Sequence, residues 1–338
     1  PCFTMGFEGA SDYYEERPAA KKIANYYGMH HSNLEISSKK LLKIIPEVFN
    51  ASDEPFADSS ALPFYALSQE VSKNIKVVLS GDGGDEVFGG YRKYLGEKWS
   101  NIGSYIPEYV RKNLAAILIE NKDTGYGELS RRIRRYLNNI DKDGVTRQIN
   151  WLEQMNQDEI KSLFGYEARN VRSVFTDSRR DLDDSINAIL LGDMEISLVG
   201  DMLVKLDRMS MANSLEVRSP FLDKELVEFA FSIPGNYKVS HFQCKKILRE
   251  TFSNRLPKWL MKLPKKGFEV PLANWLRGEL KTMLEHACLP KNLDRIGIIN
   301  HSLVNNWKDS LFSGKRDTSW KLWTLMSYFY WVESKGLA

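Results

Sequence analysis

The sequence predicts an α/β protein in which an open parallel sheet is followed by a mostly helical part. Apolar, strand-like runs alternate with helical stripes in the first part of the chain, and helical periodicity dominates after Tyr94. A turn rich in glycine and aspartate directly follows the apolar run Val77–Leu79. Strands that alternate with helices pair in parallel, because each connecting helix returns the chain to the starting edge of the sheet.

The individual elements follow from these two periodicities. A strand is expected at Pro1–Phe7, where the chain opens on an apolar run. A helix should span Ser11–Tyr27, because Ala, Ile and Tyr side chains recur there at helical spacing on one stripe. The same arguments predict a strand at His31–Ile36, a helix at Lys39–Phe49, a helix at about Leu62–Ser72 and a strand at Ile75–Leu79.

Size and charge restrict the classes of partner. A chain of 338 residues suits roughly two domains. The 47 basic and 44 acidic residues give a net charge of +3, so we expect neither nucleic acid nor membrane as a partner. The basic run Arg131–Arg135 is expected to be the solvated face of a helix. The aromatic run Trp320–Val332 is shorter than the ~20 residues of a membrane span, and we expect a helix that packs on a core.

The cysteines indicate a reducing compartment. Cys2, Cys244 and Cys288 are odd in number and have no Cys-x-x-Cys spacing, which argues against a disulfide framework and against a zinc site. We therefore expect a cytoplasmic location, and no secretory signal peptide is visible at the N-terminus.

The turn that begins at Ser80, reading SGDGGDEVFGGY, is the main candidate for a ligand site. Ligands bind at the carboxyl ends of parallel strands, and glycines let backbone N–H groups approach phosphate oxygens. Asp82, Asp85 and Glu86 would add carboxylates that suit Mg²⁺. The alternative is a solvated turn without a ligand. Dinucleotide, Walker and EF-hand patterns do not fit, because the required glycines, lysine or ligand positions are absent.

Two later segments carry charged residues in suggestive positions. Asp201–Asp223 is expected to comprise a helix with Asp201, Lys205 and Arg208 near one face and then a charged turn that ends in Ser-Pro-Phe-Leu-Asp. An Asp201–Lys205 pair on a helix surface would contribute only ~0.3–0.5 kcal/mol. The Pro- and Gly-punctuated segment Leu263–Leu272 presents two lysines, which either form a solvated basic loop or cover phosphates.

Five stretches, taken in order, resemble the synthetase half of glutamine-dependent asparagine synthetases, and the resemblance covers nearly the whole chain. The stretches are Phe3–Phe7, Asp53–Ser60, Ser80–Tyr91, Leu206–Asp223 and Pro264–Gly278, and the pattern from Leu322 to Trp331 also fits. The resemblance implies a Rossmann-like sheet of the adenine-nucleotide alpha-hydrolase (HUP) type. It implies a nucleotide-binding α/β part at residues 1–95 and a mainly helical part at residues 96–338 that completes the site.

The resemblance also implies a reaction. Members of this family use ATP and Mg²⁺ to convert the side-chain carboxylate of aspartate to an acyl-adenylate, with release of pyrophosphate. Ammonia, produced from glutamine by a glutaminase domain, then displaces AMP and forms the amide. Adenylation is needed because hydroxide is a poor leaving group and AMP is a far better one.

Site residues are carried over from the family only at matching positions. Asp82 matches an acidic position that contacts the incoming amine, and Asp85 matches a Mg²⁺ ligand. Lys265 matches a lysine that neutralises charge developing on the phosphates. Further matching positions comprise the nucleotide-binding residues Met5, Ser80, Gly81 and Gly83, and three residues near the site whose roles stay open, Arg208, Glu216 and Arg218.

The chain also departs from the family. It contains neither a glutaminase domain nor the pyrophosphate loop Ser-Gly-Gly-x-Asp-Ser, so we expect a fold truncated at its N-terminus, without its first strand–loop–helix unit. Such a fragment should be inactive alone, and an exposed sheet edge would favour poor solubility or a homodimer. Two alternatives stay open: a related ligase that amidates, or cyclises to a lactam or peptide, a different acyl substrate, and a non-catalytic remnant that serves in binding.

Overall fold

The computed structural model describes residues 1–8, 14–103, 105–118, 125–167, 184–263 and 267–337. The first part of the chain alternates strands and helices, as predicted. In order it forms β1 (Cys2–Phe7), α1 (Arg17–Tyr26), β2 (His31–Ile36), α2 (Ser38–Ala51), α3 (Ala61–Val71) and β3 (Val77–Leu79). The helix expected from Ser11 begins later, at Arg17, with a proline in its first turn. Residues 9–13 lie outside the described part of the chain.

The strands pair in parallel, which confirms the predicted pairing, but they do not form one continuous open sheet. Among the described residues β1 pairs with β2, in a register that places Cys2 opposite His31 and Phe7 opposite Ile36. β3 pairs in a separate ribbon with β4 (Glu216–Arg218). The charged turn predicted between the helix and Asp223 is therefore wrong for Glu216–Arg218, which form a strand. A strand of three residues with two charged, exposed side chains shows no apolar alternation that the sequence could reveal.

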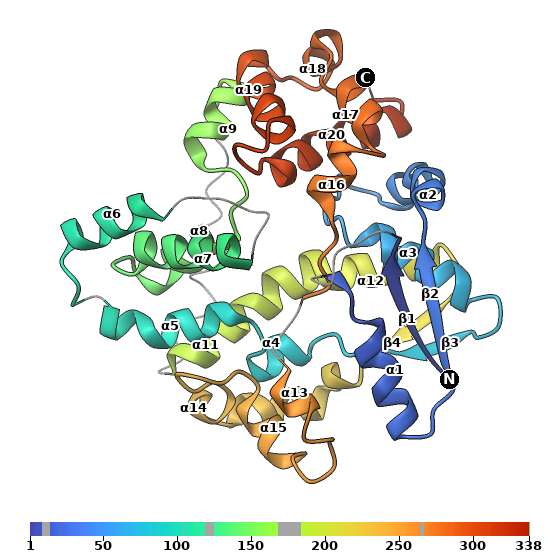
Figure 1. Ribbon diagram of the computed structural model, residues 1–338, viewed down its shortest axis with the longest axis vertical. Helices are drawn as coiled ribbons and strands as arrows, with labels where there is room; N and C mark the ends of the chain where they lie inside the picture. The colour runs from blue at the N-terminus through green and yellow to red at the C-terminus, as the bar shows by residue number, and fades with distance from the viewer. Residues whose placement is uncertain (9–13, 104, 119–124, 168–183, 264–266, 338) are drawn as a thin grey trace.

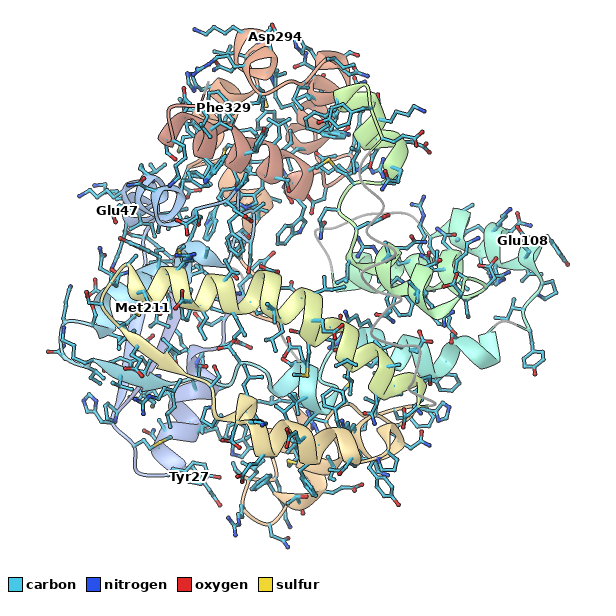
Figure 2. The ribbon with its side chains drawn as sticks, turned by 180° about the vertical axis from the view of Figure 1, so that it is seen from behind. Tyr27, Glu47, Glu108, Met211, Asp294 and Phe329 are labelled. Carbon is cyan, nitrogen blue, oxygen red and sulfur yellow. The ribbon has the colours of Figure 1, made fainter. Side chains whose placement is uncertain are left out.

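Apart from β4 and the loops, helices make up the rest of the described chain. After β3 come α4 (Gly84–Phe88), α5 (Arg92–Gly103), α6 (Glu108–Ile117), α7 (Gly125–Asn139), α8 (Gly144–Leu152) and α9 (Gln157–Phe164). A long rod follows, built from α11 (Ser185–Asp193), the π-helical η2 (Met194–Met202) and α12 (Leu203–Met211). Figure 2 shows this rod crossing the middle of the molecule to end at Met211.

The chain after β4 forms two groups of helices (Figure 1). The lower group consists of the short helix η3 (Pro220–Leu222) and of α13 (Lys224–Ser232), α14 (Gly235–Lys238) and α15 (Lys246–Thr251). The short helix η4 (Leu260–Lys262) follows. The upper group consists of α16 (Leu272–Arg277), α17 (Lys281–Ala287), α18 (Pro290–Arg295), α19 (His301–Phe312) and α20 (Ser319–Ser334).

The main hydrophobic core joins the two ends of the chain. It combines buried side chains of β1, α2 and α3 with those of the upper helical group. Trp323 of α20 is 1% exposed, and its indole N–H donates to the carbonyl oxygen of Ala57 at 2.8 Å. The rings of Phe49 and Tyr330 stack at 6.1 Å. The predicted aromatic helix at the C-terminus is thus confirmed as a core element, and it fixes the segment that leads into α3.

The division of the chain at residue 95 remains a prediction. The core includes residues from both sides of that boundary, and β4 pairs with β3 across it. Among the described residues, no helix has both the length and the apolar character needed to cross a bilayer.

β3 leaves an apolar surface uncovered. Val77 is 43% exposed and Leu79 is 73% exposed, although both belong to a strand that most α/β proteins would bury. Together with the short partner β4, this gives the ribbon one solvent-facing side of mixed apolar and charged character.

Truncation of Trp323 should severely destabilise the protein. We expect Trp323→Ala to lower the free energy of unfolding by about 3–5 kcal/mol, because it leaves a cavity and an unsatisfied Ala57 carbonyl in the core. Urea unfolding followed by circular dichroism measures the change. Tyr105→Ala is the control, since Tyr105 is 88% exposed and its removal should have little effect. Equal midpoints for the two variants would contradict this account of the core.

Candidate functional site

The turn after β3 is shaped by two left-handed glycines. Gly83 has φ +83° and caps the N-terminus of α4, and Gly89 has φ +71° and caps its C-terminus. A side chain at Gly83 is excluded for a second reason, since a Cβ there would lie 2.2 Å from Leu222 of η3. Position 83 therefore requires glycine, both because of its left-handed backbone angle and because Leu222 leaves no room for a side chain.

Backbone pairing attaches this turn to the segment that follows β4. The Ser80 N–H donates to the carbonyl oxygen of Arg218 at 2.9 Å, and the hydroxyls of Ser80 and Ser219 are 3.0 Å apart. Phe221 packs against Phe88, with ring centroids 5.9 Å apart in an edge-to-face arrangement. Two of the stretches that carry the family resemblance, Ser80–Tyr91 and Leu206–Asp223, are thus in direct contact.

The acidic residues of the turn have different environments. Asp82 and Asp85 are partly exposed, whereas Glu86 is only 2% exposed. The Tyr91 hydroxyl donates to the Glu86 carboxylate, and burial raises the pKa of Glu86. The expectation of three carboxylates beside a ligand is therefore wrong for Glu86, which binds Tyr91 within the protein.

Asp85 has a partner that the sequence did not reveal. The Lys245 ammonium lies 2.8 Å from Asp85 Oδ1, and the Lys245 N–H donates to the carbonyl oxygen of Gly89 at 3.1 Å. Gly90 makes room for this pair, because a Cβ at that position would lie 1.6 Å from the Asp85 oxygen. Lys245 lies far along the chain in a segment without a motif, so no local signal could have found it.

The described residues hold no group of three or more His, Cys, Asp or Glu side chains arranged to bind a metal. Mg²⁺ usually takes only one or two protein carboxylates and completes its shell with water and phosphate. Asp85 fits one such position, provided that Lys245 yields the oxygen it now contacts.

The three residues with open roles lie on β4 and α12. Arg218 Nε donates to Glu216 at 2.8 Å, so these two residues of β4 pair with each other. Arg208 of α12 pairs with Asp53 at 2.6 Å. The Arg208–Asp53 pair joins a third resembling stretch, Asp53–Ser60, to Leu206–Asp223, although both of its side chains are largely exposed.

Lys205 forms a buried cluster beside these residues. It is 8% exposed, and its ammonium lies 2.8 Å from Asp58 and donates to Ser60 Oγ at 2.9 Å. The sequence predicted a surface pair of Lys205 with Asp201, and this prediction is wrong because Lys205 turns into the protein toward the start of α3. Asp201 stays close enough for the Asp58 carboxylate to influence its ionisation.

The other residues predicted for the site differ in how close they lie to the turn. Met5 lies in β1, the other strand pair, with its side chain in the main core. Lys265 falls outside the described residues. Ser80, Gly81, Asp82, Gly83 and Asp85 follow one another in the turn and the start of α4. β4 brings Arg218 beside Ser80, whereas Glu216 lies at the other end of the ribbon, opposite Val77.

Comparison with known proteins matches almost the whole chain to one family. Residues 1–333 match the asparagine synthase family. The chain is 31% identical to asparagine synthetase (glutamine-hydrolyzing) 1 of Bacillus subtilis strain 168, over 97% of this chain and 51% of that protein. It is 30% identical to a putative asparagine synthetase of Mycobacterium tuberculosis H37Rv, over 97% of this chain and 50% of that protein.

A more distant relative bears a different name. The chain is 24% identical to amidase chyE of Penicillium rubens, over 92% of this chain and 49% of that protein. In all three comparisons the chain spans about half the length of the curated relative that it matches.

Asp201 should make stability depend on pH. Burial, assisted by the Asp58 carboxylate, raises the pKa of Asp201 to about 6. Because the folded-state pKa exceeds that of the unfolded chain, its favourable contribution is present below about pH 4 and is lost as pH rises through about 6. Asp201→Asn cannot ionise. Relative to the unsubstituted protein, its free energy of unfolding should therefore improve by about 1–2 kcal/mol between pH 4 and pH 7. Urea titrations at both pH values measure this, and parallel pH profiles would contradict it.

Proposed function

The chain belongs to the asparagine synthase family, and on that premise we propose that it carries the synthetase site of an ATP-dependent amide-forming ligase, with asparagine as the product. The observation that carries the proposal is the turn Ser80–Asp85, held by β4 at the end of β3, in a chain that matches the family over residues 1–333. Aspartate, ATP and ammonia would be the substrates.

The proposed reaction has two steps. A side-chain carboxylate oxygen of aspartate attacks the α-phosphorus of ATP, forms the acyl-adenylate and releases pyrophosphate. Ammonia then adds to the activated carbonyl carbon, the bond to the AMP oxygen breaks, and a proton leaves the nitrogen. The products are asparagine, AMP and pyrophosphate. The first step attaches AMP to the carboxylate as a good leaving group, and the second step releases the AMP.

The described residues suggest how the chain contributes to these steps. A Cβ at Gly81 would meet nothing within 4 Å, so the open backbone there would let its N–H group approach the phosphates. Ser80 and Gly83 would line the nucleotide beside it. The partly exposed carboxylate of Asp82 would contact the incoming amine or accept its proton. Lys265, from its loop, would neutralise charge that develops on the phosphates.

Mg²⁺ is proposed as the second cofactor beside ATP. Asp85 would hold it, and the ion would supply positive charge at the pyrophosphate oxygens. The present Asp85–Lys245 pair shows that this corner of the turn already accommodates a positive charge next to the carboxylate.

We further propose that these 338 residues alone form asparagine poorly. They contain no Ser-Gly-Gly-x-Asp-Ser sequence, which in the family supplies N–H groups for pyrophosphate and a further carboxylate.

A cytoplasmic location and a homodimer are also proposed. The location rests on the cysteines, and the homodimer rests on the exposed face of β3. The three cysteines are free thiols in the structure.

In a second candidate function, the chain adenylates a carboxylic acid other than aspartate. The similarity to a fungal protein named an amidase favours it, since that protein matches 92% of this chain. In this alternative the same turn would activate another carboxylate, in amidation or ring closure. A non-catalytic binding role is the third possibility.

Aspartate-dependent exchange of labelled pyrophosphate into ATP tests the proposal. We expect little exchange from the 338-residue chain with Mg²⁺. Robust exchange is expected when the chain is extended at its N-terminus by the corresponding region of the Bacillus subtilis relative, because the extension supplies the pyrophosphate loop. Comparable exchange by both forms would contradict the proposed dependence on that loop. Exchange by neither folded form with aspartate, but with another acid, would favour the second candidate.

The carboxylate of Asp85 should be essential in the extended form. We expect Asp85→Asn to reduce exchange by on the order of 10²-fold, because the amide cannot hold the ion or match its charge. Asp158→Asn, an exposed position in the first turn of α9, is the matched control and should retain exchange. Near-normal exchange by a folded Asp85→Asn variant would remove Asp85 from the proposed site.

A further inference from the structure

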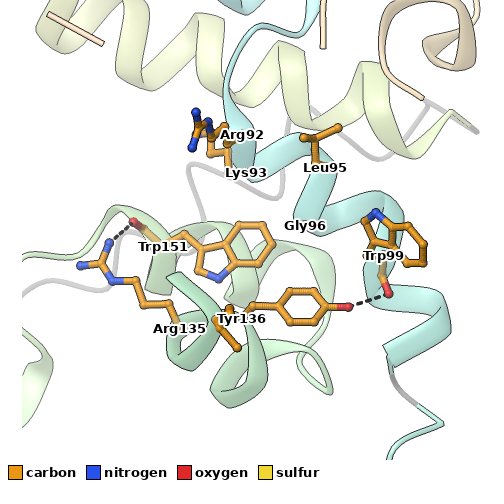
Figure 3. A pocket seen from close by; sticks show the side chains of 9 residues that line it. Arg92, Lys93, Leu95, Gly96, Trp99, Arg135, Tyr136 and Trp151 are labelled. Carbon is orange, nitrogen blue, oxygen red and sulfur yellow. Dashed lines mark hydrogen bonds between the residues drawn. The ribbon is translucent and has the colours of Figure 1, made fainter. Parts of the chain in front are cut away.

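A cavity of about 620 Å³ lies between α5, α7 and α8, outside the turn described above. Small organic ligands bind in pockets of about 300–1,000 Å³ with mainly apolar walls. Figure 3 shows the aromatic side chains of Trp99, Tyr136 and Trp151 around this cavity. Leu95 and Ile133 add aliphatic surface to its lining. Neither the family resemblance nor the proposed reaction uses these residues.

Internal hydrogen bonds hold two of the aromatic walls in place. The Tyr136 hydroxyl donates to the carbonyl oxygen of Trp99 at 2.8 Å, and the Trp99 indole N–H donates to the carbonyl oxygen of His241 at 2.8 Å. Because the backbone engages these polar atoms, the two side chains offer a ligand mainly their ring surfaces. Since the rings are already fixed, a planar ligand can pack on them at little cost in side-chain entropy.

Gly96 allows the third wall to approach α5. A Cβ at Gly96 would lie 2.9 Å from the six-membered ring of Trp151, so the indole packs directly against the glycine backbone. A larger side chain at position 96 would push this indole aside. The width of the cavity between α5 and α8 therefore depends on glycine at position 96.

The cations at the edge of the cavity are already engaged by the protein. Lys93 pairs with Asp193 at 2.5 Å, and Arg135 donates to the carbonyl oxygen of Trp151 at 3.3 Å. Arg92 and Arg135 each have further interactions within the protein. Figure 3 shows the Arg92 guanidinium turned away from the aromatic rings. A ligand between the rings thus meets mainly apolar surface, and burial there favours a neutral molecule over a charged one.

One polar atom of the aromatic walls is open to a ligand. Among the described residues, the Trp151 indole N–H has no hydrogen-bond partner, and it is not enclosed by protein atoms. In Figure 3 the indole nitrogen lies on the side of the ring that faces Tyr136. An indole N–H can only donate, so the matching group on a ligand is an acceptor such as a carbonyl oxygen.

We propose that this cavity binds a small, neutral, planar aromatic molecule that carries a carbonyl acceptor. The ring system packs against the aromatic walls, and its carbonyl oxygen lies at the edge of the Trp151 ring, where the N–H donates to it. The site is separate from the turn at the end of β3, so the proposal does not rest on the proposed ligase function.

Fluorescence titration of the 338-residue chain with prodan tests the proposal, because this neutral naphthyl ketone changes its emission when it leaves water. We expect saturable binding at one site per chain. Trp151→Phe keeps an apolar ring and removes the N–H. The preference for prodan over dimethylaminonaphthalene, which lacks the ketone, should therefore be about fivefold greater in the unsubstituted chain than in Trp151→Phe, as one hydrogen bond would give.

A second variant tests the shape of the cavity. Gly96→Ala suits a helix and should leave the chain folded, yet it displaces the Trp151 ring and should weaken prodan binding about fivefold or more. Trp259→Ala is the matched control, because Trp259 is another partly buried tryptophan that contacts a cation, Lys22, but does not line the cavity. Circular dichroism shows that each variant is folded.

Several results would overturn the proposal. They are no saturable binding of prodan by the folded chain, an equal preference for the ketone in the unsubstituted and Trp151→Phe chains, and unchanged binding in Gly96→Ala. Tighter binding of a naphthyl carboxylate than of prodan would overturn the assignment to neutral ligands. Displacement of prodan by AMP would place the probe in a nucleotide site and would overturn the separate cavity site. Because the titration itself contains no ATP and no aspartate, its failure leaves the pyrophosphate-exchange test unaffected.

Discussion

The parallel pairing of β3 with β4 is the constraint on which the candidate site depends. Two backbone hydrogen bonds frame it, from Glu216 to the Lys76 carbonyl at 2.8 Å and from Ser80 to the Arg218 carbonyl at 2.9 Å. Each such bond contributes only about 1 kcal/mol, so the pairing matters more for geometry than for stability. The pairing places Leu222 against Gly83 and Phe221 against Gly84, and these contacts fix the conformation of the turn.

Buried and half-buried ion pairs set the electrostatics around that turn. Lys205 binds Asp58 at the start of α3, and Lys245 binds Asp85 beside α4. Removal of one partner of a buried pair costs about 3–5 kcal/mol, since the other charge is left without compensation. The Lys205 pair is the more buried of the two and therefore suits a structural role. The Lys245 pair is more accessible, and a ligand with its own charges could compete for Asp85.

The C-terminal helix supports the same region from the opposite side. α20 inserts Trp323 beside α2 and binds the Ala57 carbonyl, one residue before Asp58. Figure 2 shows Phe329 of this helix in the upper group, next to α2 with Glu47. The position of Asp58 and of Lys205, its partner, thus depends on packing between the two ends of the chain. The core that stabilises the fold is also the core that positions this edge of the site.

Local patterns in the amino-acid sequence were enough to predict most of the early elements and the family. Periodicity placed β1, β2, α2 and α3 within a few residues, because apolar spacing is a property of neighbouring positions. Glycine and aspartate content identified the turn at Ser80, because the left-handed angle at Gly83 restricts that position to glycine. The contacts between distant side chains became visible only in the folded chain. The fold paired Lys205 with Asp58 and not with Asp201, gave Asp85 a lysine, buried Glu86 against Tyr91, and made a strand of Glu216–Arg218. These partners lie on different elements or depend on burial, and local spacing carries no information about either.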